Sequence, residues 1–287
     1  MSAAVQSPGA KGGTPELIDR FRQLYARRET VRFLVASHLK AGHRDKFLGR
    51  IWSLLDPLLF MLVYLLVFGM FFGQARFGGK INIADFIIYL LCGVLSWRFF
   101  EGSVSAATGC IRSNRGLIHE ISFPKAVFPL SICLSRLSDF LWGLLVLFAV
   151  VLVVGPDHLT LHVFWFPLLI LLQLMFTLGL AFIVAFLGAF FADTANIVSV
   201  TMRLWFYLSP VFYKVAKSEG GIISKGNEAL YMLNPIACFF EAYRDCLLRG
   251  QMPQANQLFY VTSIALFMLI FGFSIFSRGE GQFAKYV

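Results

Sequence analysis

A basic stem that runs directly into a long apolar stretch is the feature that most limits the fold of this chain. Residues 43–73 read HRDKFLGRIWSLLDPLLFMLVYLLVFGMFFG, with no charged residue after Asp56. About 20 apolar residues in a helix cross the hydrocarbon core of a bilayer. Trp52 suits the membrane interface, and Asp56 and Pro57 suit the cap and first position of a helix. The stretch predicts a helix that enters a membrane from its positively charged side.

Composition extends this prediction to the whole chain. Of the 287 residues, 58% are hydrophobic and only 14% are charged. Ordinary soluble domains contain about 25% charged residues, so this composition excludes one. The apolar runs predict an all-α integral membrane protein with six transmembrane helices within residues 51–276. These runs cover residues 55–73, 86–106, 126–154, 164–190, 195–213 and 256–276.

The basic residues predict the orientation. The formal net charge is +9, and 10 of the 25 Lys and Arg residues precede residue 51. Basic segments remain in the cytoplasm, so we expect the N-terminus there, and six spans return residues 277–287 to the same side as a tail. Anionic lipid headgroups are a better partner for this charge than nucleic acid. Five basic residues after the fifth run oppose the rule, namely Lys214, Lys217, Lys225, Arg244 and Arg249.

The N-terminal segment divides into two parts. Residues 1–13 are small, polar and glycine-rich, which predicts a disordered tail and no cleavable signal peptide. Residues 14–50 predict a cytoplasmic interface helix and stem, with Thr14 as cap and Pro15 at the first position. The helical spacing of apolar residues suits a helix on the inner leaflet, and docking on a partner protein is the alternative. Those residues are Leu17, Phe21, Leu24, Val31 and Leu34.

The segment between the last two runs, residues 209–250, differs from the rest. It contains Pro210, Asn234-Pro235 and a semi-apolar run with Glu241 and Arg244. Residues 235–248 are too short and too charged to span, so they predict a helix that re-enters the outer leaflet. A solvent-exposed loop with one surface helix is the alternative.

Motifs for catalysis are absent from the sequence. There is no GxSxG, no HExxH and no CxxC, and the pair His158 and His162 has no third ligand nearby, so we expect no metal site. Residues 73–80, GQARFGGK, depart from the P-loop in spacing and in the residue that follows the lysine. The sequence therefore offers no catalytic constellation and no way to hydrolyse ATP by itself.

Charged residues inside apolar runs are the default functional candidates. Arg98 with Glu101, and Arg136 with Asp139, are each three residues apart and can neutralise each other on one helix. Arg203 has no such local carboxylate. Arg203 is therefore the better candidate for contact with an anionic headgroup or a diphosphate, and Arg136 is the second candidate.

Aromatic residues near the ends of the runs are the second candidate group. Interfacial belts explain many such residues, and stacking against sugar rings in a channel is the alternative. The candidates for a channel lining are Trp97, Phe100, Trp205, Tyr207, Phe212 and Tyr213.

Three motifs occur in order along the chain. The first motif consists of Arg44, Leu48-Gly49, Trp52 and Asp56-Pro57. The second is residues 114–130, NRGLIHEISFPKAVFPL. The third is residues 208–213, LSPVFY, followed by Asn234-Pro235 and by Glu241 with Arg244. Together they resemble the ABC-2 type permeases that export polysaccharides, which are the membrane subunits of O-antigen, teichoic acid and capsule exporters. The resemblance covers nearly the whole chain.

The resemblance implies a transporter subunit rather than an enzyme. It implies a homodimer paired with two separate ATPase subunits, which bind ATP and Mg²⁺. It implies a coupling helix at Arg112, Ser113, Asn114, Arg115, Gly116, Leu117 and Ile118. It also implies an outer gate that includes Pro210, Asn234, Pro235, Glu241 and Arg244. The N-terminal amphipathic helix would support lateral entry of a lipid-linked glycan.

The main hypothesis is export of an undecaprenyl-diphosphate-linked polysaccharide, such as O-antigen, across the bacterial inner membrane. A teichoic acid or capsule exporter, and an ABC-2 exporter of drugs or small lipids, are alternatives within transport. A membrane enzyme or scaffold is the alternative outside it, and it would need a polar catalytic cluster at the end of a span.

Overall fold

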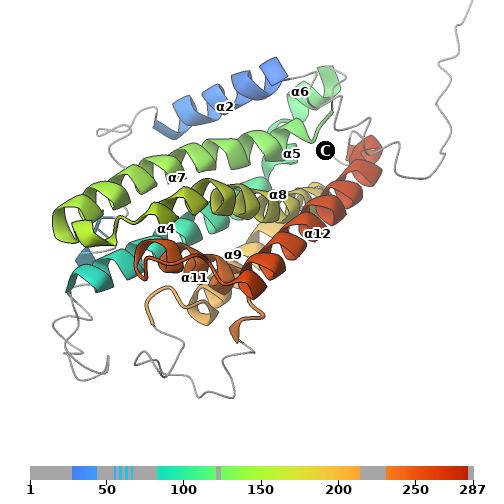
Figure 1. Ribbon diagram of the computed structural model, residues 1–287. Helices are drawn as coiled ribbons and strands as arrows, with labels where there is room; N and C mark the ends of the chain where they lie inside the picture. The colour runs from blue at the N-terminus through green and yellow to red at the C-terminus, as the bar shows by residue number, and fades with distance from the viewer. Residues whose placement is uncertain are drawn as a thin grey trace, which may run out of the picture.

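The computed structural model describes residues 28–43, 83–120, 124–213 and 231–283, with isolated positions between 55 and 66. Every regular element in these ranges is a helix, which confirms the all-α prediction (Figure 1). The helices are α2 Arg28–His43, α4 Ile83–Ala107, α5 Cys110–Ser113, α6 Arg115–Glu120, α7 Val127–Val154, α8 Phe166–Phe190, α9 Thr194–Leu208, α11 Pro235–Leu247 and α12 Ala255–Gly279, with 3-10 turns η3 Pro156–His158, η4 Leu161–Trp165 and η6 Glu280–Gln282.

Four of these helices are long and apolar enough to cross a membrane. The candidate spans are Asp85–Ala107, Val127–Val153, Leu161–Phe190 and Ala255–Gln282. They coincide with four of the six predicted runs, because an uninterrupted apolar run of this length has only one way to satisfy its backbone in lipid. The chain is therefore a multi-pass membrane protein.

The other two predicted spans have a different status. The first, residues 55–73, lies outside the described residues apart from isolated positions. The fifth corresponds to α9, whose 15 residues give a helix about 22 Å long, shorter than a hydrocarbon core of about 30 Å. Six spans thus stay a prediction.

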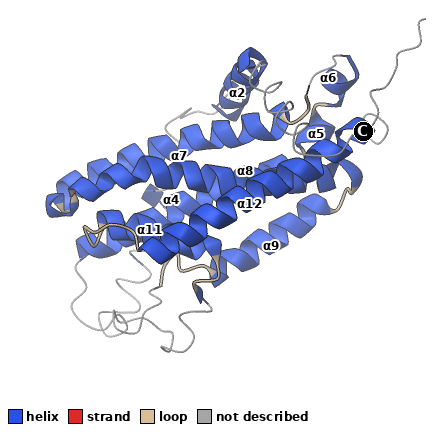
Figure 2. Ribbon diagram, turned by 45° about the vertical axis from the view of Figure 1, so that its right-hand side comes forward, coloured by secondary structure: helices blue, strands red, loops and turns tan. Residues whose placement is uncertain are grey.

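The long helices run side by side, and the short elements gather at their two ends (Figures 1 and 2). Helices α5 and α6 lie at the end where α12 finishes, and α11 lies toward the opposite end. We call these the α5–α6 end and the α11 end. Helix α2 lies along α7 with Val31 and Leu34 buried, so the described half of the predicted amphipathic helix packs its apolar face on protein. Residues 14–27 lie outside the described ranges.

Glycine brings α8 into backbone contact with α12. A Cβ at Gly179 would collide with the carbonyl oxygen of Met268, and a Cβ at Gly272 would collide with the carbonyl oxygen of Gly179. Small residues let membrane helices approach this closely, which increases their packing contacts. These two glycines therefore set the crossing of α8 and α12.

The last described residues pack on the α5–α6 end. Phe283 is fully buried in a hydrophobic cluster that includes Ile111 and Ile118. The backbone N–H of Lys125 donates to a carboxylate oxygen of Glu280, and Lys125 Nζ donates to the Glu280 carbonyl oxygen at 3.0 Å. The part of the predicted tail from residue 277 to residue 283 is thus joined to the start of α7.

Candidate functional site

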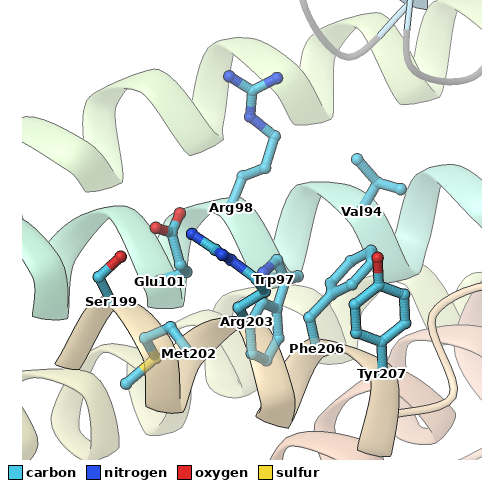
Figure 3. A pocket seen from close by; sticks show the side chains of 9 residues that line it. All are labelled: Val94, Trp97, Arg98, Glu101, Ser199, Met202, Arg203, Phe206 and Tyr207. Atoms are coloured by element: carbon cyan, nitrogen blue, oxygen red, sulfur yellow. The ribbon is translucent and has the colours of Figure 1, made fainter. Parts of the chain in front are cut away.

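A cavity lies between α4 and α9, with a volume of about 400 Å³ (Figure 3). The wall from α4 shows helical spacing, with lining residues at positions 94, 97, 98 and 101, and the wall from α9 repeats it at 199, 202, 203 and 206. Each set occupies one face of its helix, so the two faces oppose each other. The lining residues are Val94, Trp97, Arg98, Glu101, Ser199, Met202, Arg203, Phe206 and Tyr207.

The charges of the cavity come from both helices. The Arg203 side chain extends toward Glu101, whereas Arg98 points away from both (Figure 3). The Ser105 hydroxyl donates to Glu101 Oε1 at 3.4 Å. The carboxylate predicted to neutralise Arg98 within α4 thus faces the arginine of α9. The cavity combines the Arg203 guanidinium and the Glu101 carboxylate with three aromatic rings, and Arg98 lies at its edge.

The structure brings three of the predicted site residues together in this cavity, namely Trp97, Arg203 and Tyr207. Phe100 is fully buried behind it and packs edge-on against Trp205, with ring centroids 5.3 Å apart. Arg136 is elsewhere. It pairs with Asp139 at 4.0 Å on α7 and lies over Gly102 of α4. It therefore does not line the cavity with Arg203.

A fully buried arginine marks the α11 end of the cavity. Nη2 of Arg244 donates to the carbonyl oxygens of Pro210 at 2.8 Å and Val211 at 3.0 Å, and Nη1 donates to Glu241 Oε1 at 2.8 Å. Nε and Nη2 also reach the carbonyl oxygen of Tyr89 on α4, at 3.4 and 3.3 Å. The guanidinium carbon lies 3.4 Å from the centroid of the Tyr89 ring. We call these five residues the Arg244 cluster.

The cluster satisfies backbone groups where α9 ends. Carbonyl oxygens beyond a helix end need partners when they are shielded from water. Arg244 supplies them for Pro210 and Val211, and the Tyr89 hydroxyl donates to the Tyr213 carbonyl oxygen at 2.6 Å. The segment that follows α9 is therefore held by side chains of α4 and α11.

A second arginine balances the charge around Glu241. Arg249 Nη2 lies 2.9 Å from Glu241 Oε2, and Arg249 Nη1 lies 2.6 Å from Asp245 Oδ1. Burial raises the pKa of the Glu241 carboxyl, but the positive charges of Arg244 and Arg249 lower it by more. The pKa of Glu241 therefore lies below its ordinary value. Burial raises the pKa of Asp245, whose Oδ2 has no hydrogen-bond partner among the described residues.

Asn234 joins the end of α9 to the start of α11. Its Oδ1 accepts from the Ile236 backbone N–H at 3.1 Å, which caps α11, and from the Trp205 indole at 3.0 Å. Its Nδ2 donates to the Ser209 hydroxyl at 2.9 Å, and Pro235 occupies the first turn of α11. The five residues predicted for an outer gate therefore converge, although residues 214–230 between them lie outside the described ranges.

A polar network in the core was not predicted from the sequence. Gln173 Nε2 donates to the Ser96 hydroxyl at 2.8 Å, and the Tyr243 hydroxyl donates to Gln173 Oε1 at 2.9 Å. The network ties α8 to α4 and to α11, and all three residues are buried. A glutamine inside the run of α8 was its only signal in the sequence.

The predicted coupling residues form the two short helices of the α5–α6 end. Arg115, Gly116 and Leu117 are exposed, whereas Ile118 is buried. Arg112 Nη2 donates to the Ala189 carbonyl oxygen of α8 at 3.4 Å. The segment thus presents an exposed face while its other face is fixed to the spans.

The spans, the charged cavity between α4 and α9, and the exposed short helices together define a polytopic membrane protein. Within that class, the chain belongs to the ABC-2 type transporter family, whose model matches residues 29–248. The family resemblance predicted from the three motifs is confirmed.

Relatives extend the match over nearly the whole chain. It is similar to the O-antigen export system permease protein RfbA of Myxococcus xanthus, with 31% identity over 94% of this chain and 99% of the relative. It is also similar to a protein of that name from Klebsiella pneumoniae, with 27% identity over 86% of this chain and 90% of the relative. The polysialic acid transport protein KpsM of Escherichia coli shares 21% identity over 88% of this chain and 93% of its own length.

Proposed function

We propose that this chain is the permease subunit of an ATP-driven exporter that moves a lipid-linked polysaccharide, such as an undecaprenyl-diphosphate-linked O-antigen, across the bacterial inner membrane. The observation that carries the proposal is the end-to-end similarity to an O-antigen export permease. The membrane fold and the cavity between α4 and α9 are compatible with it. Polysialic acid transport relatives at lower identity support a capsule-type substrate as the second candidate.

The proposal includes six spans with both termini in the cytoplasm. Residues 55–73 would form the first span, and α9 with the segment after it would form the fifth. Helix α11, about 20 Å long from its 13 residues, would re-enter the outer leaflet without crossing it. The buried Arg244 cluster supports this placement, because polar groups shielded from water must satisfy one another.

Energy would enter at the α5–α6 end. Two separate ATPase subunits would bind ATP and Mg²⁺, and each would receive the loop from Arg112 to Ile118. The exposed Arg115 and Leu117 suit contact with a partner, and the contact of Arg112 with α8 would carry the movement into the spans.

The cavity would take part in substrate handling. Arg203 offers a guanidinium group to a diphosphate, and Trp97, Phe206 and Tyr207 offer aromatic faces to sugar rings. Arg136, which is exposed on α7, would contact lipid headgroups. The carboxylate of Glu101 would then accept from sugar hydroxyl groups.

A second copy would complete the channel. Helix α9 exposes an apolar stripe on its outward face, formed by Ile197, Val200, Leu204 and Leu208. The spacing follows one face of the helix. We assign this stripe to contact between the two subunits, and crosslinking of a Leu204→Cys variant to itself tests it.

Co-purification and reconstitution test the proposed function. The detergent-solubilised chain should recruit an ATPase subunit with Walker motifs, and vesicles containing both should export lipid-linked polysaccharide when ATP is added. If the vesicles transport a small lipid or a drug, and added polysaccharide does not change that transport, the alternative exporter of drugs or small lipids is favoured. Failure to recruit any ATPase would remove the exporter assignment altogether.

A further inference from the structure

The Arg244 cluster sits at one end of both walls of the cavity. On α4, the lining residue Val94 directly follows Gly93, and Gly93 lies against Arg244. On α9, the lining residue Tyr207 precedes Pro210 by three residues, and the Tyr213 hydroxyl donates to the Tyr207 carbonyl oxygen at 3.1 Å. The cluster and the cavity are therefore neighbours along both helices.

The separation of α4 from α9 sets the width of the cavity, because all of its lining residues belong to these two helices. At its start, α9 is connected to α8 by the three residues 191–193. At its end, the guanidinium of Arg244 binds carbonyl oxygens of Pro210 and Val211 on one side and that of Tyr89 of α4 on the other. One side chain from α11 thus holds the end of α9 against α4.

Gly93 is the position that makes room for this arrangement. A Cβ there would lie 2.9 Å from Arg244 Nη2 and 2.9 Å from the Val211 carbonyl oxygen, which is closer than such contacts occur. Gly102, nine residues further along α4, differs, because a Cβ there would meet its nearest atom at 3.7 Å. Only the first of these glycines is required by the cluster.

We infer that Arg244 is a positioning residue that holds the end of α9 against α4, and that Gly93 leaves the space its guanidinium occupies. The cavity widens at its α11 end only when the hydrogen bonds from Arg244 to Pro210 and Val211 break. The planar guanidinium suits this task because it donates in several fixed directions, which a lysine ammonium on the same helix does not match. Closure is the resting state, since separation leaves carbonyl oxygens without donors in a buried place. The link from closure to substrate passage rests on the proposed function, whereas closure itself does not.

Thiol labelling of the cavity wall tests the inference in the purified full-length chain. Met202 lines the cavity and is only 5% exposed, so a Met202→Cys variant reports on opening. With Arg244→Lys added, a maleimide should react with that thiol about tenfold faster, because several bonds to a charged group are lost. Gly93→Ala should act in the same direction, and Gly102→Ala should leave the rate unchanged.

The native Cys133, on α7 and fully buried, separates opening from unfolding. Mass spectrometry after digestion assigns each label to its cysteine. Faster reaction at the Met202→Cys thiol, with Cys133 still protected, supports the inference. An unchanged rate, or an equal increase at Cys133, overturns it. Because the assay needs neither substrate nor ATPase, a lack of polysaccharide export would overturn the proposed function and leave this result standing.

Discussion

Trp205 and Asn234 are 29 residues apart in the chain, yet the indole Nε1 donates to the Asn234 Oδ1 at 3.0 Å. The same oxygen caps α11, and the amide nitrogen of Asn234 binds Ser209. One side chain therefore fixes how the end of α9 meets the start of α11. The Arg244 cluster closes the same junction from the other end of α11.

Removal of the Asn234 amide should loosen this junction. Asn234→Ala loses a helix cap and leaves the Trp205 indole without its acceptor. Together these losses should lower the free energy of unfolding by about 1–3 kcal/mol. We expect a lower thermal unfolding midpoint for the purified chain. Asn256→Ala, an exposed asparagine on α12, is the control and should unfold like the parent. Equal midpoints for the two variants would show that the junction does not depend on Asn234.

The sequence predicted elements more reliably than it predicted contacts between elements. Helices α4, α7, α8 and α12 follow from apolar runs, because length and hydropathy are properties of one segment. The start of α11 at Pro235 follows from the Asn-Pro pair, in which asparagine caps and proline suits the first turn. These signals are local, and the structure has an element at each of them.

The partners of charged residues could not be predicted in the same way. Arg98 and Glu101 were paired because they are three residues apart on one helix. In the structure, Arg203 of α9 extends toward Glu101, and Arg98 points away (Figure 3). Spacing along a helix contains no information about which second helix packs on it. The hydrogen bonds of Gln173 to α4 and α11 were missed for the same reason.

Substitution of the cavity arginine should weaken substrate binding and leave assembly intact. Arg203 is exposed on the cavity wall, so Arg203→Leu removes a charge without leaving a buried void. We expect the KM for a diphosphate-linked glycan to rise about tenfold, which is the typical loss for one charge-assisted contact. Transport kinetics in vesicles, compared with the parent at equal protein, measure it.

Arg136→Leu is the matched control for this prediction, since it removes an arginine from a neighbouring span outside the cavity. Its KM should stay within about twofold of the parent value, because surface ion pairs contribute little. A larger effect of Arg136→Leu than of Arg203→Leu would move the site of anion contact from α9 to α7.

Charge reversal at the α5–α6 end should separate docking from the integrity of the fold. Arg115 is exposed, so Arg115→Glu should leave the thermal midpoint unchanged and reduce stimulation of the partner ATPase by glycan. Arg112→Glu also removes the bond to the Ala189 carbonyl oxygen, and we expect it to lower the midpoint as well. ATPase assays and thermal unfolding on the same preparations distinguish the two. Full stimulation with Arg115→Glu would exclude that residue from coupling.

The crossing of α8 and α12 should tolerate no methyl group. A Cβ at Gly179 or at Gly272 would collide with backbone atoms of the facing helix, so neither Gly179→Ala nor Gly272→Ala can be absorbed by a change of rotamer. Each substitution should separate the helices and lower the free energy of unfolding by about 1–3 kcal/mol or more. The yield of folded chain after detergent extraction and its thermal midpoint report the loss. Gly281→Ala, which would meet nothing within 4 Å, should behave like the parent.

The double variant adds a test of the physical cause. Once one methyl group has forced α8 and α12 apart, the second methyl group finds part of the space already open. The double variant should therefore lose less free energy of unfolding than the sum of the losses in the two single variants. Strictly additive losses would indicate that each glycine acts through the flexibility of its own helix rather than through the shared crossing. Measured unfolding of the single and double variants in one detergent decides between contact across the crossing and independent effects within each helix.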